Sequence, residues 1–114
     1  MKKPAKPKIR VPAAPNTLGA EGRKLWRRIA EDYDLDAAAL VILESACLSQ
    51  DRESGASAQL VTDGTTTTDR FGQVKAHPAV LIERDSRAAK LRALKQLNLD
   101  MEPLNDKPGR PAGR

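Results

Sequence analysis

Apolar residues recur at three- and four-residue intervals in three stretches of the chain, and this spacing predicts three helices. The first stretch covers residues 18–33, the second residues 37–60 and the third residues 78–97. The polar pair at 16–17 is suited to cap the first helix, and Asp36 is suited to cap the second. The second and third helices would each span about 30 Å, and a short connection between them favours an antiparallel pair.

The segment between the second and third helices has a different pattern. Four successive threonines at 65–68 disfavour a helix and favour extended chain, because a β-branched side chain is restricted in a helix. Gly64 and Gly72 are turn signals on either side of them. Residues 61–74 are therefore predicted to form a short β-hairpin or an ordered loop. The predicted fold class is mainly α, with this small feature between helices two and three.

The basic character of the chain is concentrated in its two ends. The whole chain of 114 residues has a net charge of +5. Residues 1–11 hold five basic and no acidic residues, and residues 104–114 hold three basic and one acidic, which leaves 12 basic and 14 acidic residues between them. Both ends are rich in proline or glycine, so we expect them to be disordered. The predicted organisation is a basic, Pro-rich arm over 1–15, a helical body over 16–103 and a Gly/Pro/Arg-rich tail over 104–114.

The composition argues against several classes of protein. A single cysteine and a single histidine provide neither a disulfide framework nor a usual zinc ligand set. No apolar run reaches the roughly 20 residues that span a bilayer, and the first residues lack the apolar segment of a signal peptide. The chain also has no Gly-rich phosphate loop of the ATPase type. We therefore expect an intracellular protein that is not an enzyme and that uses no metal and no cofactor.

The residues with reactive side chains have simpler structural interpretations. His77 precedes Pro78 at a predicted helix start, which indicates a helix cap or a loop contact. Asp63 and Asp69 flank the threonine run without the spacing of a calcium loop, so we expect them to cap turns. Cys47 lies among apolar residues and is expected to be a core thiol.

A body with only three aromatic residues has a small core. The second half of the second helix is polar and the third helix is striped with charge, so one chain provides little apolar surface to cover them. Association of several copies would supply the missing burial, which predicts an oligomer. Trp26 is suited either to the core or to a subunit interface. The predicted interface residues are Trp26, Leu81, Ala88, Leu91 and Leu94.

Lysine and arginine clusters are the candidate nucleic-acid contacts, because each such side chain can neutralise a backbone phosphate. On the first helix, residues four apart share a face and form a basic edge. The sequence at 109–111 in the tail also resembles the core of an AT-hook. The predicted DNA-binding residues are Lys2, Lys3, Lys6, Lys8, Arg10, Arg23, Lys24, Arg27, Arg28, Lys107, Arg110 and Arg114.

The same charges have a structural alternative. The ends would then only keep the protein in solution, and the basic edge would be a solvated face balanced by nearby acidic residues. The cations of the third helix either line a channel or form ion pairs, and their interleaving with Glu83 and Asp85 favours ion pairs.

Several short motifs follow one another along residues 15–114. They are Pro15-Asn16-Thr17-Leu18, Gly22 to Trp26 with Ile29, Tyr33-Asp34-Leu35, Leu40 to Asp51-Arg52 with Cys47 a turn before Asp51, Asp63-Gly64, Gly72, His77-Pro78, Glu83-Arg84, Leu94 to Leu99, Glu102-Pro103 and Gly109 to Arg114. In this order they resemble the phage terminase small subunit, in the branch common in phages with a packaging-linked HNH endonuclease gene.

The resemblance implies a non-catalytic DNA-packaging factor in the host cytoplasm. Such proteins bind viral DNA near the packaging start site, assemble into rings and pass the DNA to the large terminase subunit, which carries the ATPase and nuclease. The implied partners are double-stranded viral DNA, the large subunit and further copies of the chain in a ring, with no membrane. Two alternatives stay open: a helical oligomeric adaptor that contacts only proteins, and a small dimeric DNA-binding transcription regulator.

Overall fold

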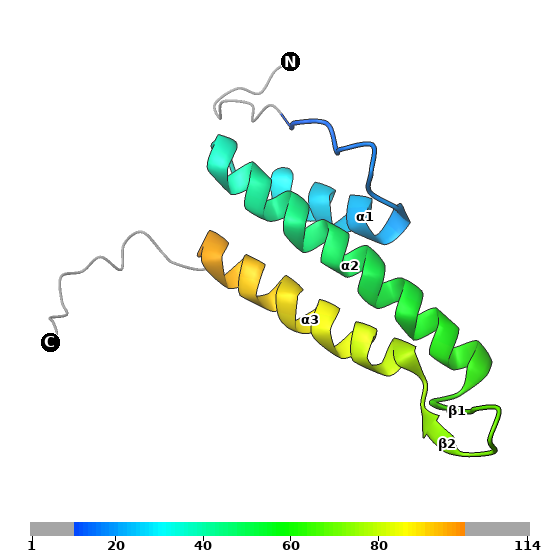
Figure 1. Cartoon of the computed structure of the whole chain (residues 1–114). Helices are drawn as coiled ribbons and strands as arrows, with labels where there is room; N and C mark the ends of the chain where they lie inside the picture. The colour runs from blue at the N-terminus through cyan, green and yellow to red at the C-terminus, as the bar shows by residue number, and fades with distance from the viewer. Residues whose placement is uncertain (1–10, 100–114) are drawn as a thin grey trace, which may run out of the picture.

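The computed structural model describes residues 11–99, which form three helices and one two-stranded antiparallel sheet (Figure 1). The elements are α1 (Ala20–Ala30), α2 (Ala37–Asp63), β1 (Thr66–Thr68), β2 (Val74–Ala76) and α3 (Pro78–Leu97). The long helix α2 runs through the middle, with α1 beside its first half and α3 along its length. The mainly helical fold class, with a small hairpin between the second and third helices, is confirmed. The arm and tail that we expect to be disordered lie outside the described residues, apart from 11–15.

Helices α2 and α3 form the predicted antiparallel pair. Polar contacts join Gln50, Glu53 and Ser57 of α2 to positions of α3 that run in the opposite order, and Figure 1 shows the two helices side by side. Helix α2 begins at its predicted cap, where the Asp36 carboxylate accepts a hydrogen bond from the Ala39 N–H at 2.9 Å. Its polar second half stays helical because α3 packs along it, and the helix extends three residues beyond the predicted end.

Helix α1 is shorter than predicted at both ends, and its predicted cap is wrong. Neither Asn16 nor Thr17 caps it; the first N–H groups are satisfied from α2 instead. The Asp51 carboxylate accepts hydrogen bonds from the backbone N–H of Gly19 at 2.6 Å and from that of Gly22 at 2.7 Å. A carboxylate at this position also interacts favourably with the positive end of the helix dipole.

The contact between α1 and α2 holds the apolar core. Leu18, Trp26 and Ala30 from the α1 side pack with Leu43 and Cys47 of α2, and all five side chains are buried. Burying side chains of this size contributes roughly 1.5–3 kcal/mol for each large one, so this contact is the main source of hydrophobic stabilisation.

The two helices cross very closely at Gly22. A Cβ atom at this position would lie 2.8 Å from the backbone oxygen of Cys47 and would collide with the Asp51 carboxylate. Only glycine allows this approach, so Gly22, Cys47 and Asp51 form one packed unit although they lie far apart in sequence.

The contact between α2 and α3 is made of small and polar residues. Ala79, Ser86 and Ala93 recur every seven residues on the buried side of α3, and Ser49 and Ala56 are buried on α2. Small side chains let two helix backbones approach closely, and the seven-residue repeat keeps the same face of α3 in contact along the pair. Leu97, near the end of α3, also packs against the apolar core, whereas Leu81, Ile82 and Leu91 of α3 stay exposed.

The hairpin joins α2 and α3 with Thr66 opposite Ala76 and Thr68 opposite Val74. Asp69 stabilises its turn, since Oδ1 accepts hydrogen bonds from the N–H groups of Phe71 at 2.8 Å and Gln73 at 2.9 Å. The predicted turn-capping role of Asp69 is therefore confirmed. Within residues 11–99, no helix is both long and apolar enough to cross a bilayer.

Candidate functional site

Three cations lie on the outer surface of α1 and form what we call the basic edge of α1: Lys24, Arg27 and Arg28. All three side chains are exposed, and they line a shallow groove of about 430 Å³ together with Leu25 of α1 and Gln50 of α2. Glu21 lies at one end of the groove. The groove is open to solvent along α1, so an extended anionic ligand could lie against these side chains.

Arg23, which the sequence places in the same cluster, has a different role. Its side chain is half-buried; Nε donates a hydrogen bond to the Leu18 carbonyl at 3.1 Å, and an Nη donates to the Asn16 carbonyl at 3.4 Å. These bonds attach the chain before α1 to the helix. Two of its donors thus bind backbone carbonyls, and the DNA contact of Arg23 stays a prediction.

The remaining cations differ in how strongly they are already paired. Lys24 forms an ion pair with Glu21 at 3.3 Å, and both side chains are well exposed, so the pair is weak. Within the described part of the chain, Arg27 and Arg28 form no ion pair. Both lie in the last turn of α1, where the helix dipole also favours positive charge.

The chain that precedes α1 is attached to the same part of the molecule. The indole Nε1 of Trp26 donates a hydrogen bond to the Pro12 carbonyl at 2.9 Å, and Val11 lies beside Ala30 and Tyr33. The predicted contacts at Lys2, Lys3, Lys6, Lys8 and Arg10 precede this anchor and lie outside the described residues. The predicted contacts Lys107, Arg110 and Arg114 also lie outside them.

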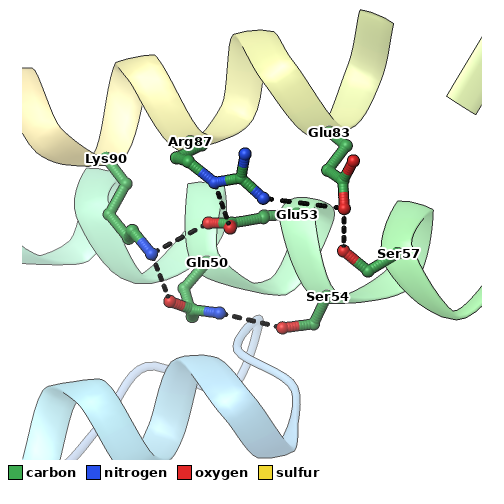
Figure 2. A network of polar contacts seen from close by, with 7 residues as sticks. All are labelled: Gln50, Glu53, Ser54, Ser57, Glu83, Arg87 and Lys90. Carbon is green, nitrogen blue, oxygen red and sulfur yellow. Dashed lines mark hydrogen bonds and ion pairs between the residues drawn. The ribbon is translucent and has the colours of Figure 1, made fainter. Parts of the chain in front are cut away.

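The cations of α3 are arranged quite differently, and Figure 2 shows their contacts. Glu53 of α2 lies between two of them: Arg87 Nε is 2.8 Å from Oε2, and Lys90 Nζ is 2.8 Å from Oε1. The Glu53 and Lys90 side chains are only 13% and 17% exposed, so the pair is largely removed from water.

The network around Glu53 continues on both sides (Figure 2). Lys90 also donates to the Gln50 side-chain oxygen at 2.9 Å, and the Gln50 amide donates to the Ser54 hydroxyl at 2.9 Å. On the other side, an Nη atom of Arg87 lies 3.6 Å from Oε2 of Glu83. The same oxygen accepts a hydrogen bond from the Ser57 hydroxyl of α2. This chain of contacts fixes the register of α3 on α2.

The electrostatics of Glu53 follow from these neighbours. Burial alone would raise the pKa of Glu53, but Lys90 and Arg87 together hold it below its ordinary value of 4.5. Glu53 is therefore ionised at neutral pH and stabilises both cations. Arg84 also pairs with Asp85 at 3.3 Å, so the prediction that the cations of α3 form ion pairs is confirmed for Arg84, Arg87 and Lys90.

The predicted interface residues fall into two groups. Trp26 is only 4% exposed and belongs to the core of a single chain, which corrects its assignment to a subunit interface. Leu81 and Leu91 are about half exposed, Ala88 is exposed, and Leu94 is partly buried. Leu81 and Leu91 are thus accessible to another molecule, and the role of the α3 residues in a subunit interface stays a prediction.

The reactive side chains have structural roles. The Nδ1 atom of His77 accepts a hydrogen bond from the Ala79 N–H at 3.0 Å, and Nε2 lies 3.0 Å from Asp63, which confirms that His77 caps α3. Burial, with the nearby Asp51 and Glu44 charges, raises the pKa of the Cys47 thiol to about 12, so it is not a nucleophile at neutral pH. Within residues 11–99, no group of three or more His, Cys, Asp or Glu residues is placed to hold a metal ion.

Two residues that organise the molecule, Asp51 and Glu53, were not identified from the sequence. Each acts across a helix contact, and no local motif marks a carboxylate whose partner is about 30 residues away. The only signal was their position on an otherwise polar half of α2 that must face another helix. Comparison of the chain with protein-family models, with curated proteins and with solved structures gave no match.

Proposed function

We propose that this protein is a non-catalytic viral DNA-packaging factor. It binds double-stranded viral DNA near the packaging start site, forms a homo-oligomeric ring and recruits the large terminase subunit in the host cytoplasm. The family assignment rests on the ordered motifs that resemble the phage terminase small subunit. The physical support comes from the charges of α1 and of the arm that precedes it.

The observation that best supports DNA binding is that the side chains of Arg27 and Arg28 are exposed and unpaired within residues 11–99. Both are exposed in a shallow groove and neither forms an ion pair within the described residues. Two neighbouring free guanidinium groups can bind backbone phosphates and release counterions. Trp26 anchors Pro12 to the same helix, and the five cations of residues 2–10 precede this anchor in the sequence.

A binding titration tests the proposal. The fluorescence anisotropy of a labelled viral duplex and of an unrelated duplex is measured with the full chain at two salt concentrations. We expect binding that weakens steeply with salt. Replacing Lys2, Lys3, Lys6, Lys8 and Arg10 by Ala reduces the slope of log K against log salt by about 0.9 for each phosphate contact removed. Absence of binding at the lower salt concentration would overturn DNA binding and favour the protein adaptor.

The number of copies in the assembly distinguishes the proposed ring from the remaining alternative, a dimeric transcription regulator. Native mass spectrometry of the full chain is expected to show an assembly of about eight or more copies, because a closed ring around or beside DNA needs many subunits. A dimer with a palindromic DNA site would instead indicate a transcription regulator. The exposed apolar residues of α3 and of the hairpin support an assembly with further protein copies.

A further inference from the structure

The hairpin presents an aromatic side chain at its tip, which we call the hairpin knob (Arg70 and Phe71). Phe71 is 80% exposed, and the Arg70 guanidinium lies 5.6 Å from the centre of its ring. Asp69 holds the turn by two hydrogen bonds to the backbone, and Lys75 pairs with Asp69 at 3.4 Å. The knob is therefore a fixed projection with a large apolar surface, and ordering it on binding requires little loss of conformational entropy.

The opposite end of the α2–α3 pair carries an apolar groove, which we call the end groove. It lies between the last turn of α1 and the end of α3 and has a volume of about 450 Å³. Its lining is mainly apolar, and Lys95 and Asn98 are the two polar exceptions among Ile29, Tyr33, Leu91, Leu94, Lys95, Asn98 and Leu99. Figure 1 shows the hairpin at one end of the helical pair and the C-terminal end of α3 at the other, so the knob cannot reach the groove of its own chain.

The charges near the two features are complementary. The turn that follows α1, next to Tyr33, carries exposed Glu31, Asp32 and Asp34, whereas the knob carries Arg70. Lys95 of α3 is the one cation among the residues that line the groove. This acidic turn would repel a DNA phosphate but would attract the guanidinium of Arg70.

We propose that the hairpin knob of one copy docks in the end groove of a second copy, with Phe71 against the apolar lining and Arg70 toward the acidic turn. The inference rests on the proposed oligomer and specifies how its subunits join. Two different surfaces meet in this contact, so it is heterologous. Repetition of a heterologous contact gives a ring when the rotation closes and a filament when it does not.

Two single variants test the contact: Phe71→Ala removes the knob, and Leu91→Asp places a charge in the groove. Both side chains are exposed in one chain, so circular dichroism should show an unchanged fold. Sedimentation velocity should show that each variant assembles at least about tenfold more weakly than the unmodified chain. Val74→Ala is the matched control, because Val74 is an exposed apolar residue of the same hairpin away from the tip.

Mixing the two variants gives the sharpest result. Phe71→Ala keeps an intact groove and Leu91→Asp keeps an intact knob, so one intact contact remains between them. We expect the mixture to form a one-to-one heterodimer that neither variant forms alone. Unchanged assembly of Phe71→Ala, or a mixture without heterodimer, would overturn the proposal.

The same samples separate this inference from the proposed function. If Phe71→Ala assembles normally and the unmodified chain binds DNA, the docking mode is wrong and the packaging function stands. If Phe71→Ala lowers DNA affinity without changing the assembly, the knob is a DNA contact, and the docking mode is also wrong. If assembly follows the knob but no DNA is bound, the docking mode stands and the proposed function fails.

Discussion

Helices α1 and α3 pack on the same central helix in opposite ways. Helix α1 turns its apolar residues inward, where Trp26 and Ala30 are buried, and leaves Arg27 and Arg28 in solvent. Helix α3 turns small residues and the Lys90 cation inward and leaves Leu81, Ile82 and Leu91 exposed. The residue types of the two helices are similar, but the surfaces that they offer to other molecules are not.

The difference shows that whether a cation is available to bind DNA depends on the ion pairs that it already forms. Arg87 and Lys90 of α3 share one carboxylate, Glu53, which lies on α2 and not on α3 itself. A phosphate could recruit them only at the expense of the contact between the helices. The cations of the basic edge of α1 (Lys24, Arg27 and Arg28) form no ion pair with another helix within residues 11–99, so they can bind DNA without breaking a contact between helices.

Removal of the α1 anchor should have the largest effect. Trp26→Ala deletes the largest side chain of the core and the hydrogen bond to Pro12, and it should lower the free energy of unfolding by about 3–5 kcal/mol. Urea unfolding measures the change. Val41→Ala, at an exposed apolar position of α2, is the control and should change it by no more than about 0.5 kcal/mol. A loss of similar size in both variants would contradict the assignment of the core.

The ion pair between Glu53 of α2 and Lys90 of α3 should cost stability when one partner is replaced, and much less when both are replaced. Glu53→Leu leaves Lys90 without its carboxylate in a largely buried position and should lower the free energy of unfolding by about 2 kcal/mol. Adding Lys90→Leu removes the unpaired charge and should restore most of that loss. Urea unfolding of Glu53→Leu, Lys90→Leu and the double variant, together with the unmodified chain, completes a double-mutant cycle. Strictly additive losses would show that Glu53 and Lys90 are not coupled.

The cap that α2 supplies to α1 should have a smaller effect. Asp51→Ala removes the acceptor for the N–H groups of Gly19 and Gly22 and should lower the free energy of unfolding by about 1–2 kcal/mol. Arg52→Ala, at the next and exposed position, is the matched control. Equal unfolding curves for Asp51→Ala and the unmodified chain would remove the cap from this account.

The pH dependence should be the smallest effect on stability. The folded pKa of Glu53 lies below its ordinary value of 4.5, so its contribution is fully present above that pH. This contribution to stability is lost as the pH falls below 4.5 toward the folded pKa of Glu53. Protonation of the Glu53 carboxylate then removes its attraction to Arg87 and Lys90. Glu53→Gln should therefore lose less stability than the unmodified chain between neutral pH and pH 3–4, as measured by thermal unfolding. Parallel pH profiles would contradict this role of Glu53.

The parts of the fold that were predicted from the sequence depend on neighbours in sequence. The caps at Asp36 and His77 and the hairpin after Gly64 each follow from a few adjacent residues. The start of α1 depends instead on Asp51, whose partners are brought close only by folding. The ion pairs of α3 were predicted from its own acidic residues, but Glu53 of α2, the shared partner of Arg87 and Lys90, was not. Trp26 shows the same limit, because its apolar spacing on α1 fits a core and an interface equally well.

The division between α1 and α3 is tested most directly by two charge-matched variants, Arg27→Gln/Arg28→Gln on α1 and Arg84→Gln/Arg87→Gln on α3. Anisotropy titration with viral duplex over a range of salt concentrations is combined with urea unfolding of both proteins. The α1 variant should reduce the slope of log K against log salt by about 2. It should lower the free energy of unfolding by no more than about 1 kcal/mol, because only the interaction of the two charges with the helix dipole is lost. The α3 variant should unfold more easily and keep the slope. Equal reductions of the slope in both variants would show that net charge alone governs DNA binding, and would contradict the assignment of DNA binding to the basic edge of α1.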